Sequence, residues 1–220
     1  MSTAPNDHAN KALDDSTENS LESFNFSVFD FHPVIVLPKD YEVFDFTESY
    51  DPNRERMAYG IGKYNEKRAG MYTSELFAAE DEKVRNVHIG IDIAAPLGTD
   101  VHAFHDGEIF LAGVNSADGD YGGTLITKHR LGGRDLYALY GHLSHRSLEG
   151  KTPGQKISKG EVIAWVGPKE ENGGWNPHLH FQLSWKKPDV CDLPGVVSVL
   201  DREEALKIYP DPRLVLGKLY

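Results

Sequence analysis

The chain has 220 residues, of which 40% are hydrophobic and 26% charged, a composition typical of a globular protein that buries a core without disulfides. Lys and Arg together number 23 against 34 Asp and Glu, so the formal net charge is −11. This balance excludes nucleic acid and an anionic membrane as expected partners, because both attract basic surfaces. The lone cysteine, Cys191, excludes an internal disulfide and is interpreted as a partly buried apolar residue.

Residues 1–22 are polar and acidic, and such a segment buries too little apolar surface to offset its chain entropy. We therefore expect a disordered tail. The sequence shows no export signal and no run of about 18 apolar residues, which predicts a cytoplasmic protein without a transmembrane segment. No feature of the sequence indicates an oligomeric state.

Residues 23–85 form an irregular lead-in region that we expect to pack on the main domain. Aromatic and β-branched residues between Phe24 and Val36 favour short strands, and prolines interrupt them. Further along lie four residues that could wall a cleft, although a solvated loop is the favoured interpretation: Tyr64, Glu66, Arg68 and Tyr72.

Residues 86–185 predict an all-β domain, an antiparallel sheet with a polar open face. Strand-like runs recur with turn signals between them, at 107–114, 123–130, 134–143, 161–167 and 178–185. Gly132-Gly133 fits a two-residue hairpin turn, and strands this close in sequence pair antiparallel. Residues 186–220 form a C-terminal extension with one short helix at about 201–209, which Pro210 and Pro212 end.

Two segments carry side chains that suit a metal. Alternation along a strand places His88, Gly90 and Asp92 on one face, and the isoleucines between them on the other. The same alternation in Pro177 to Leu183 places His178, His180 and Gln182 on one face. Imidazole and carboxylate are both good zinc ligands.

A third histidine, His142, stands beside a glycine at the end of a predicted strand. Any one histidine is more often a surface or core residue than a ligand, but three such groups on polar strand faces are hard to explain by packing alone. The remaining histidines are interpreted as structural or surface residues, His129 among them.

These motifs, in this order, resemble the lysostaphin/LytM family of zinc endopeptidases. The family pattern consists of His-x-Gly-x-Asp, Tyr-x-His-Leu and Pro-His-Leu-His-Phe, which stand here at 88–92, 140–143 and 177–181. The resemblance extends over roughly residues 86–185. It implies a fold of the duplicated-hybrid-motif type and a zinc metallopeptidase domain over that range.

The resemblance also implies the roles of five residues. His88, Asp92 and His180 would bind one zinc ion per chain, and His142 and His178 would be catalytic residues that do not bind it. No His-Glu-x-x-His sequence supplies a glutamate base, so the acid–base chemistry is expected of histidines.

The resemblance implies a peptidoglycan cross-link or stem peptide as substrate. Two alternatives are kept open, a degenerate family member that binds without cutting, and an amidase that acts on another cytoplasmic peptide. The loop 169–176 is bulkier and more acidic than in the family. We expect Trp175, Glu170 and Glu171 to wall the cleft and to weaken cleavage of intact cell wall.

Overall fold

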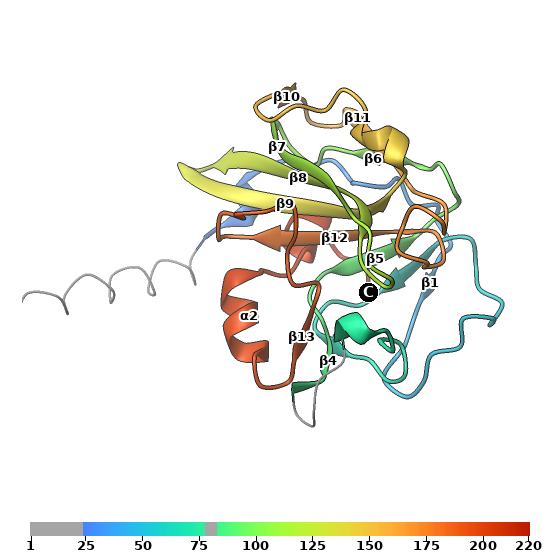
Figure 1. Cartoon of the computed structure of the whole chain (residues 1–220). Helices are drawn as coiled ribbons and strands as arrows, with labels where there is room; N and C mark the ends of the chain where they lie inside the picture. Colours follow the sequence, from blue (N-terminus) through green and yellow to red (C-terminus); the bar gives the residue numbers. More distant parts are fainter. Residues whose placement is uncertain (1–23, 78–82) are drawn as a thin grey trace, which may run out of the picture.

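A twisted eight-stranded sheet organises the computed structural model, which describes residues 24–77 and 83–220 (Figure 1). The expected tail at 1–22 lies outside these residues. In spatial order the strands are β1 (Glu42–Val43), β2 (Gly60–Gly62), β5 (Ile91–Ala94), β12 (His178–Ser184), β9 (Arg134–Leu143), β8 (Gly122–Leu131), β7 (Gly107–Asn115) and β10 (Lys156–Ile157). All neighbours pair antiparallel except β1 and β2, so the predicted all-β fold is confirmed.

Two smaller sheets complete the molecule. β6 (Asp100–His102) pairs with β11 (Val162–Trp165), and β4 (Arg85–His88) lies between β13 (Val196–Ser198) and β3 (Glu66–Lys67). The predicted strands at 107–114, 123–130, 134–143, 161–167 and 178–185 correspond to β7, β8, β9, β11 and β12. Gly132 and Gly133 both have positive φ, as a type I′ hairpin turn between β8 and β9 requires.

The segment from His88 to Ile93 differs from the single strand expected of it. β4 ends at His88 and β5 begins at Ile91, and the two strands belong to different sheets. Ile89 packs in one apolar cluster, with Val87 and Tyr121, while Ile91 and Ile93 pack in another. The sequence pattern predicts one strand because all three isoleucines are buried, but Ile89 lies on the opposite side of the large sheet from Ile91 and Ile93.

Both faces of the large sheet are therefore covered. One cluster includes Ile91, Leu179 and Phe181 together with Val34 and Ile35 of the lead-in region. The other includes Ile89, Ile126 and Leu139 together with Val197 and Ala205 of the C-terminal extension. The sheet face that carries His178 and His180 is exposed only beyond the segments packed on it, and this limits the access of solvent to these side chains.

Short helices lie around the sheets. The 3-10 helices are η1 (Phe26–Val28), η2 (Glu75–Phe77) and η4 (His145–Leu148). The C-terminal extension holds α2 (Arg202–Ile208), which lies beside β13 and β4 in Figure 1, and α3 (Arg213–Leu216). Pro212 is the N-cap of α3, so it begins a second helix beyond the one expected. No helix among the described residues is long and apolar enough to span a membrane.

Candidate metal centre

Three side chains converge where β5, β12 and the end of β4 meet. The register places His180 directly opposite Asp92, and His88 reaches the same point from β4. Asp92 Oδ1 lies 3.1 Å from His88 Nε2 and 3.0 Å from His180 Nδ1, and the two nitrogens are 3.1 Å apart. These three atoms form a nearly equilateral triangle of possible metal ligands.

The donor set fits zinc. At zinc–ligand distances of about 2.0–2.1 Å, tetrahedral donors lie about 3.3 Å apart, close to the sides of this triangle. Two imidazole nitrogens and one carboxylate oxygen are borderline ligands that suit zinc, and three protein donors leave the fourth tetrahedral position to water or substrate.

The outer nitrogen of His180 has a partner that sets the tautomer required for a ligand, and the outer nitrogen of His88 has a carbonyl acceptor within reach. His180 Nε2 lies 3.1 Å from Gln182 Oε1, which accepts its proton and leaves Nδ1 free. His88 Nδ1 faces the Lys63 carbonyl oxygen and Arg68 Nη2, each at 2.9 Å. Only the tautomer that donates from Nδ1 to this carbonyl leaves the Nε2 lone pair for a metal.

His142 and His178 stand beside the triangle, with ring centroids 4.2 Å apart. His142 Nδ1 donates to the Asn172 carbonyl at 2.8 Å, and His178 Nδ1 donates to the Asn176 carbonyl at 2.7 Å. Each Nε2 is therefore an unprotonated acceptor, and that of His178 lies 3.8 Å from Asp92 Oδ1. His142 has φ +62°, a left-handed conformation that is rare outside glycine and typical of functional sites.

Burial keeps these imidazoles neutral. Desolvation lowers the pKa of His88 to about 4, with help from the Arg68 charge, and holds the pKa of His142 well below its ordinary value. Desolvation also lowers the pKa of His178. Burial opposes ionisation of Asp92, but its interactions with His88, Arg68 and His180 outweigh this and hold the pKa of Asp92 well below its usual range. A carboxylate and neutral imidazoles are the forms that bind a metal and accept protons.

A cleft of about 660 Å³ opens onto the centre. His88, Asp92, His142, His178 and His180 all line it. Its walls come from the lead-in region, the 169–176 loop and the C-terminal extension. The lining includes the aromatic residues Phe44, Phe46, Tyr50, Tyr72, Phe77 and Trp175, and also the arginines Arg54, Arg56, Arg68 and Arg85. The cleft is therefore suited to an extended chain with apolar groups.

The 169–176 loop contributes differently from what we expected. Trp175 lines the cleft, and its indole Nε1 donates to the Gly119 carbonyl at 3.1 Å. Glu170 and Glu171 do not line it, and the Glu171 carboxylate instead accepts from the backbone N–H of His145 at 2.7 Å. The expectation that the two glutamates wall the cleft is wrong, because neither is among its lining residues and Glu171 instead bonds to the start of η4.

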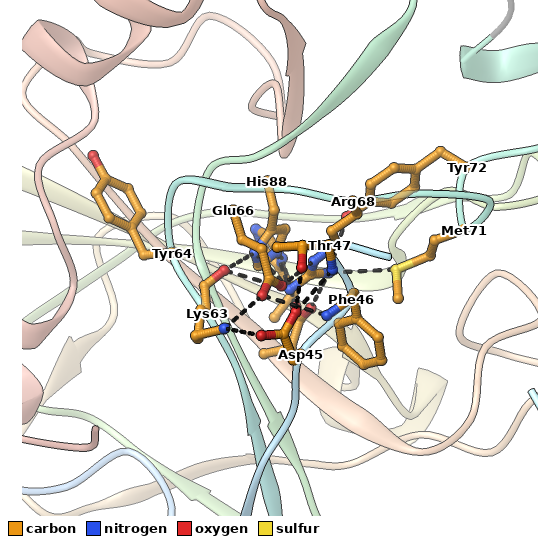
Figure 2. Close-up of polar contacts among 12 residues, drawn as sticks. Asp45, Phe46, Thr47, Lys63, Tyr64, Glu66, Arg68, Met71, Tyr72 and His88 are labelled. Carbon is orange, nitrogen blue, oxygen red and sulfur yellow. Dashed lines mark hydrogen bonds and ion pairs between the residues drawn. The ribbon is translucent and has the colours of Figure 1, made fainter. Parts of the chain in front are cut away.

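Arg68 is the functional-site residue that the sequence interpretation underrated. Arg68 and Glu66 lie together (Figure 2) and are buried, with side chains 2% and 3% exposed. Arg68 Nη1 donates to Asp92 Oδ2 at 2.7 Å. The available signal was the alternation of Glu66, Lys67 and Arg68, which puts two opposite charges on one strand face. A solvated loop is therefore the wrong interpretation for this pair.

Two other residues remain outside the centre. His129 is fully buried in β8 and bonds to Thr127 Oγ1 at 2.7 Å and to the Asp106 carbonyl at 3.0 Å, a structural arrangement. Cys191 is half-buried, and desolvation raises the pKa of its thiol to about 12, which makes it a poor nucleophile.

Comparisons with known proteins point to one family. Residues 86–191 match the family model described as Peptidase family M23. The chain is 42% identical over 97 residues to the "DD-carboxypeptidase/endopeptidase Mpg" of Neisseria meningitidis serogroup B, an alignment that covers 44% of this chain and 20% of that protein. It is 30% identical over 122 residues to the "Peptidoglycan DD-endopeptidase ShyA" of Vibrio cholerae, covering 54% of this chain and 26% of the relative.

The chain thus spans about a fifth to a quarter of the length of these relatives. Among solved structures, the catalytic domain of lysostaphin from Staphylococcus simulans matches with a TM-score of 0.42 and 23% identity, over 64% of this chain and 90% of that chain. A zinc-containing peptidase from Vibrio cholerae matches with a TM-score of 0.41 and 25% identity, over 60% and 38%.

Proposed function

Because residues 86–191 belong to peptidase family M23, we propose that this chain is a zinc-dependent peptidase that hydrolyses a peptide bond of a peptidoglycan-type substrate. The observation that carries the proposal is the triangle of His88, Asp92 and His180, with the acceptor nitrogens of two further histidines beside it. The relatives named as peptidoglycan peptidases support the choice of substrate.

Zinc, when bound, would activate a water molecule as nucleophile and polarise the scissile carbonyl. Side chains of the protein transfer the protons. Neutral His142 or His178 accepts the proton of the attacking water at Nε2, and the protonated imidazole can then donate it to the leaving amine. The carbonyls of Asn172 and Asn176 fix both rings through Nδ1, so neither ring must reorient during the reaction.

The cleft favours an extended peptide whose apolar groups contact aromatic walls. Trp175 narrows it beside His142, with ring centroids 6.5 Å apart. We therefore still expect weak cleavage of intact cell wall. The cause would be the bulk of Trp175 and not the charge of Glu170 and Glu171, since neither glutamate lines the cleft.

The test begins with metal content. The purified protein is expected to contain one zinc per chain and to cleave muropeptides or short peptides, with activity that a chelator removes and added zinc restores. His180→Ala is expected to lose the zinc, because two remaining protein ligands rarely hold it tightly. Full zinc occupancy in this variant would overturn the ligand assignment.

The same assay separates the alternatives. Zinc binding without turnover of any substrate would favour a binding module, and turnover of short peptides alone would favour a non-peptidoglycan amidase. All five positions of the centre are occupied by residues able to act as proposed, which favours an enzyme over a degenerate module.

A further inference from the structure

A buried ionic cluster links the lead-in region to Asp92. We name it the Arg68 cluster and define it as Lys63, Glu66, Arg68 and Tyr72. We infer that Arg68 is a positioning residue that fixes the carboxylate of Asp92, so that Oδ1 alone is offered to the metal. The inference rests on the proposed function, because it assigns a role toward the zinc that Asp92 would bind.

Arg68 contacts one carboxylate oxygen of Asp92 and leaves the other free to face the two histidines. Arg68 Nη1 donates to Asp92 Oδ2 at 2.7 Å, while Oδ1 faces His88 and His180 at 3.1 and 3.0 Å. Each oxygen thus has a separate set of partners. A carboxylate held in this way cannot turn to present both oxygens to one ion without breaking a charge-assisted hydrogen bond.

Arg68 is itself held in place. Its Nε donates to Glu66 Oε2 at 3.2 Å, and Nη1 also donates to the Tyr72 hydroxyl at 2.9 Å. Glu66 Oε1 in turn lies 3.0 Å from Lys63 Nζ, which lies 3.3 Å from the exposed Asp45. Figure 2 shows Asp45, Lys63, Glu66 and Arg68 joined by these contacts, and their charges alternate in sign.

The fold leaves space for this arrangement at a glycine. Gly62 of β2 pairs with Asp92, and a Cβ added at Gly62 would lie 2.8 Å from Arg68 Nη2 and 3.0 Å from Asp92 Oδ2. Any larger residue would therefore displace the guanidinium or the carboxylate. β2 thus leaves room for the Arg68–Asp92 pair because Gly62 has no side chain.

Burial argues against a substrate-binding role for Arg68. Its side chain is 2% exposed, and all three guanidinium nitrogens contact protein groups. A buried arginine with carboxylates on two sides is instead suited to fixing geometry. Groups that orient metal ligands in this way typically change metal affinity by about 10–100-fold when they are removed.

The experiment measures metal binding by the full chain. Arg68→Met is expected to raise the zinc dissociation constant by about 10–100-fold in competition with a chromophoric chelator. The visible absorption spectrum of the Co²⁺-loaded protein is expected to change as well, because a freed Asp92 can offer both oxygens and raise the coordination number. Arg213→Met is the matched control, since Arg213 is also ion-paired, with Asp211, but lies outside the cleft.

Arg68→Met leaves the buried Glu66 without its arginine and can unfold the chain. The double variant E66Q/R68M removes both charges, and circular dichroism checks its fold. A wild-type Co²⁺ spectrum in a folded variant lacking Arg68 overturns the inference, even if zinc affinity falls, and so does an equal spectral change in Arg213→Met. If the unmodified chain binds neither metal, the proposed function fails instead.

Discussion

His142 and His178 combine neutrality with a fixed orientation. Burial lowers the pKa of both imidazoles, and backbone carbonyls hold both rings through Nδ1. Neither residue belongs to the triangle of possible metal ligands. Their removal should therefore affect proton transfer and leave metal binding in place.

We expect His142→Ala and His178→Ala to retain zinc but to lose activity by about 10²–10⁴-fold, the usual effect of removing an acid–base group. Zinc content and kcat/KM on the same peptide substrate would be measured for each variant. Loss of zinc from either variant would show that a ligand had been mistaken for a catalytic residue.

His129 makes a separate contribution, to the pH dependence of stability. Desolvation lowers its pKa in the folded chain from 6.5 to about 4, so the unfolded chain binds the extra proton between these values. The neutral His129 thus stabilises the fold fully above pH 6.5. We expect this contribution, about 3 kcal/mol, to be lost as the pH falls toward 4.

His129→Gln should flatten this dependence, because glutamine does not titrate. Urea unfolding of the wild type and the variant at pH 7 and pH 4.5 would measure the difference. An equal loss of unfolding free energy in both proteins would contradict the assignment to His129.

At the scale of elements, the corner between β4 and β5 brings His88 into the centre. Gly90 lies in this corner, and a Cβ added there would lie 2.5 Å from His180 Cε1 and 2.6 Å from Nε2. The ring of His180 therefore occupies space that only glycine leaves free. The positions of His88 and Asp92 in the centre therefore depend on the glycine between them, which leaves space for the His180 ring.

We expect Gly90→Ala to weaken zinc binding at least tenfold, a size typical of disturbed metal-site geometry. Gly113→Ala is a suitable control, since its Cβ would meet only Cys191, at 3.3 Å. Competition with a chelator would measure both variants. Equal zinc affinity in Gly90→Ala and the wild type would show that the ring can move without loss.

The sequence predicted the strands of residues 107–185 closely, because strand-forming runs alternate there with glycine-containing turns. It also placed His178, His180 and Gln182 on one face, where β12 does present them to the cleft side. The corner at Gly90 and the buried Arg68 could not be predicted in this way. Both depend on partners distant in sequence, His180 for Gly90 and Asp92 for Arg68.

At the scale of the whole molecule, the lead-in region is part of the main sheet. β2 pairs with β5, while Val34 and Ile35 are fully buried against the core. The domain boundaries expected from the sequence stay a prediction. The contacts of β2, Val34 and Ile35 cross the boundary expected at residue 85. The segment that matches the family would expose the edge of β5 if it were separated from residues 24–77.

We expect a fragment of residues 86–191 to fail to fold cooperatively, because it lacks β2, the Arg68 cluster and the lead-in part of the core. Circular dichroism during thermal unfolding, together with zinc binding, would compare the fragment with the full chain. A cooperative transition and wild-type zinc affinity in the fragment would show that the lead-in region is dispensable.

The three candidate ligand residues come from two sheets. His88 ends β4 of the three-stranded sheet, whereas Asp92 and His180 belong to β5 and β12 of the eight-stranded sheet. An ion bound by all three would act as a cross-link between layers that otherwise meet through side-chain packing. Loading the protein with metal should then slow amide hydrogen exchange in β3, β4 and β13 more than in β7 and β8, so a bound ion would also stabilise the packing of the two sheets.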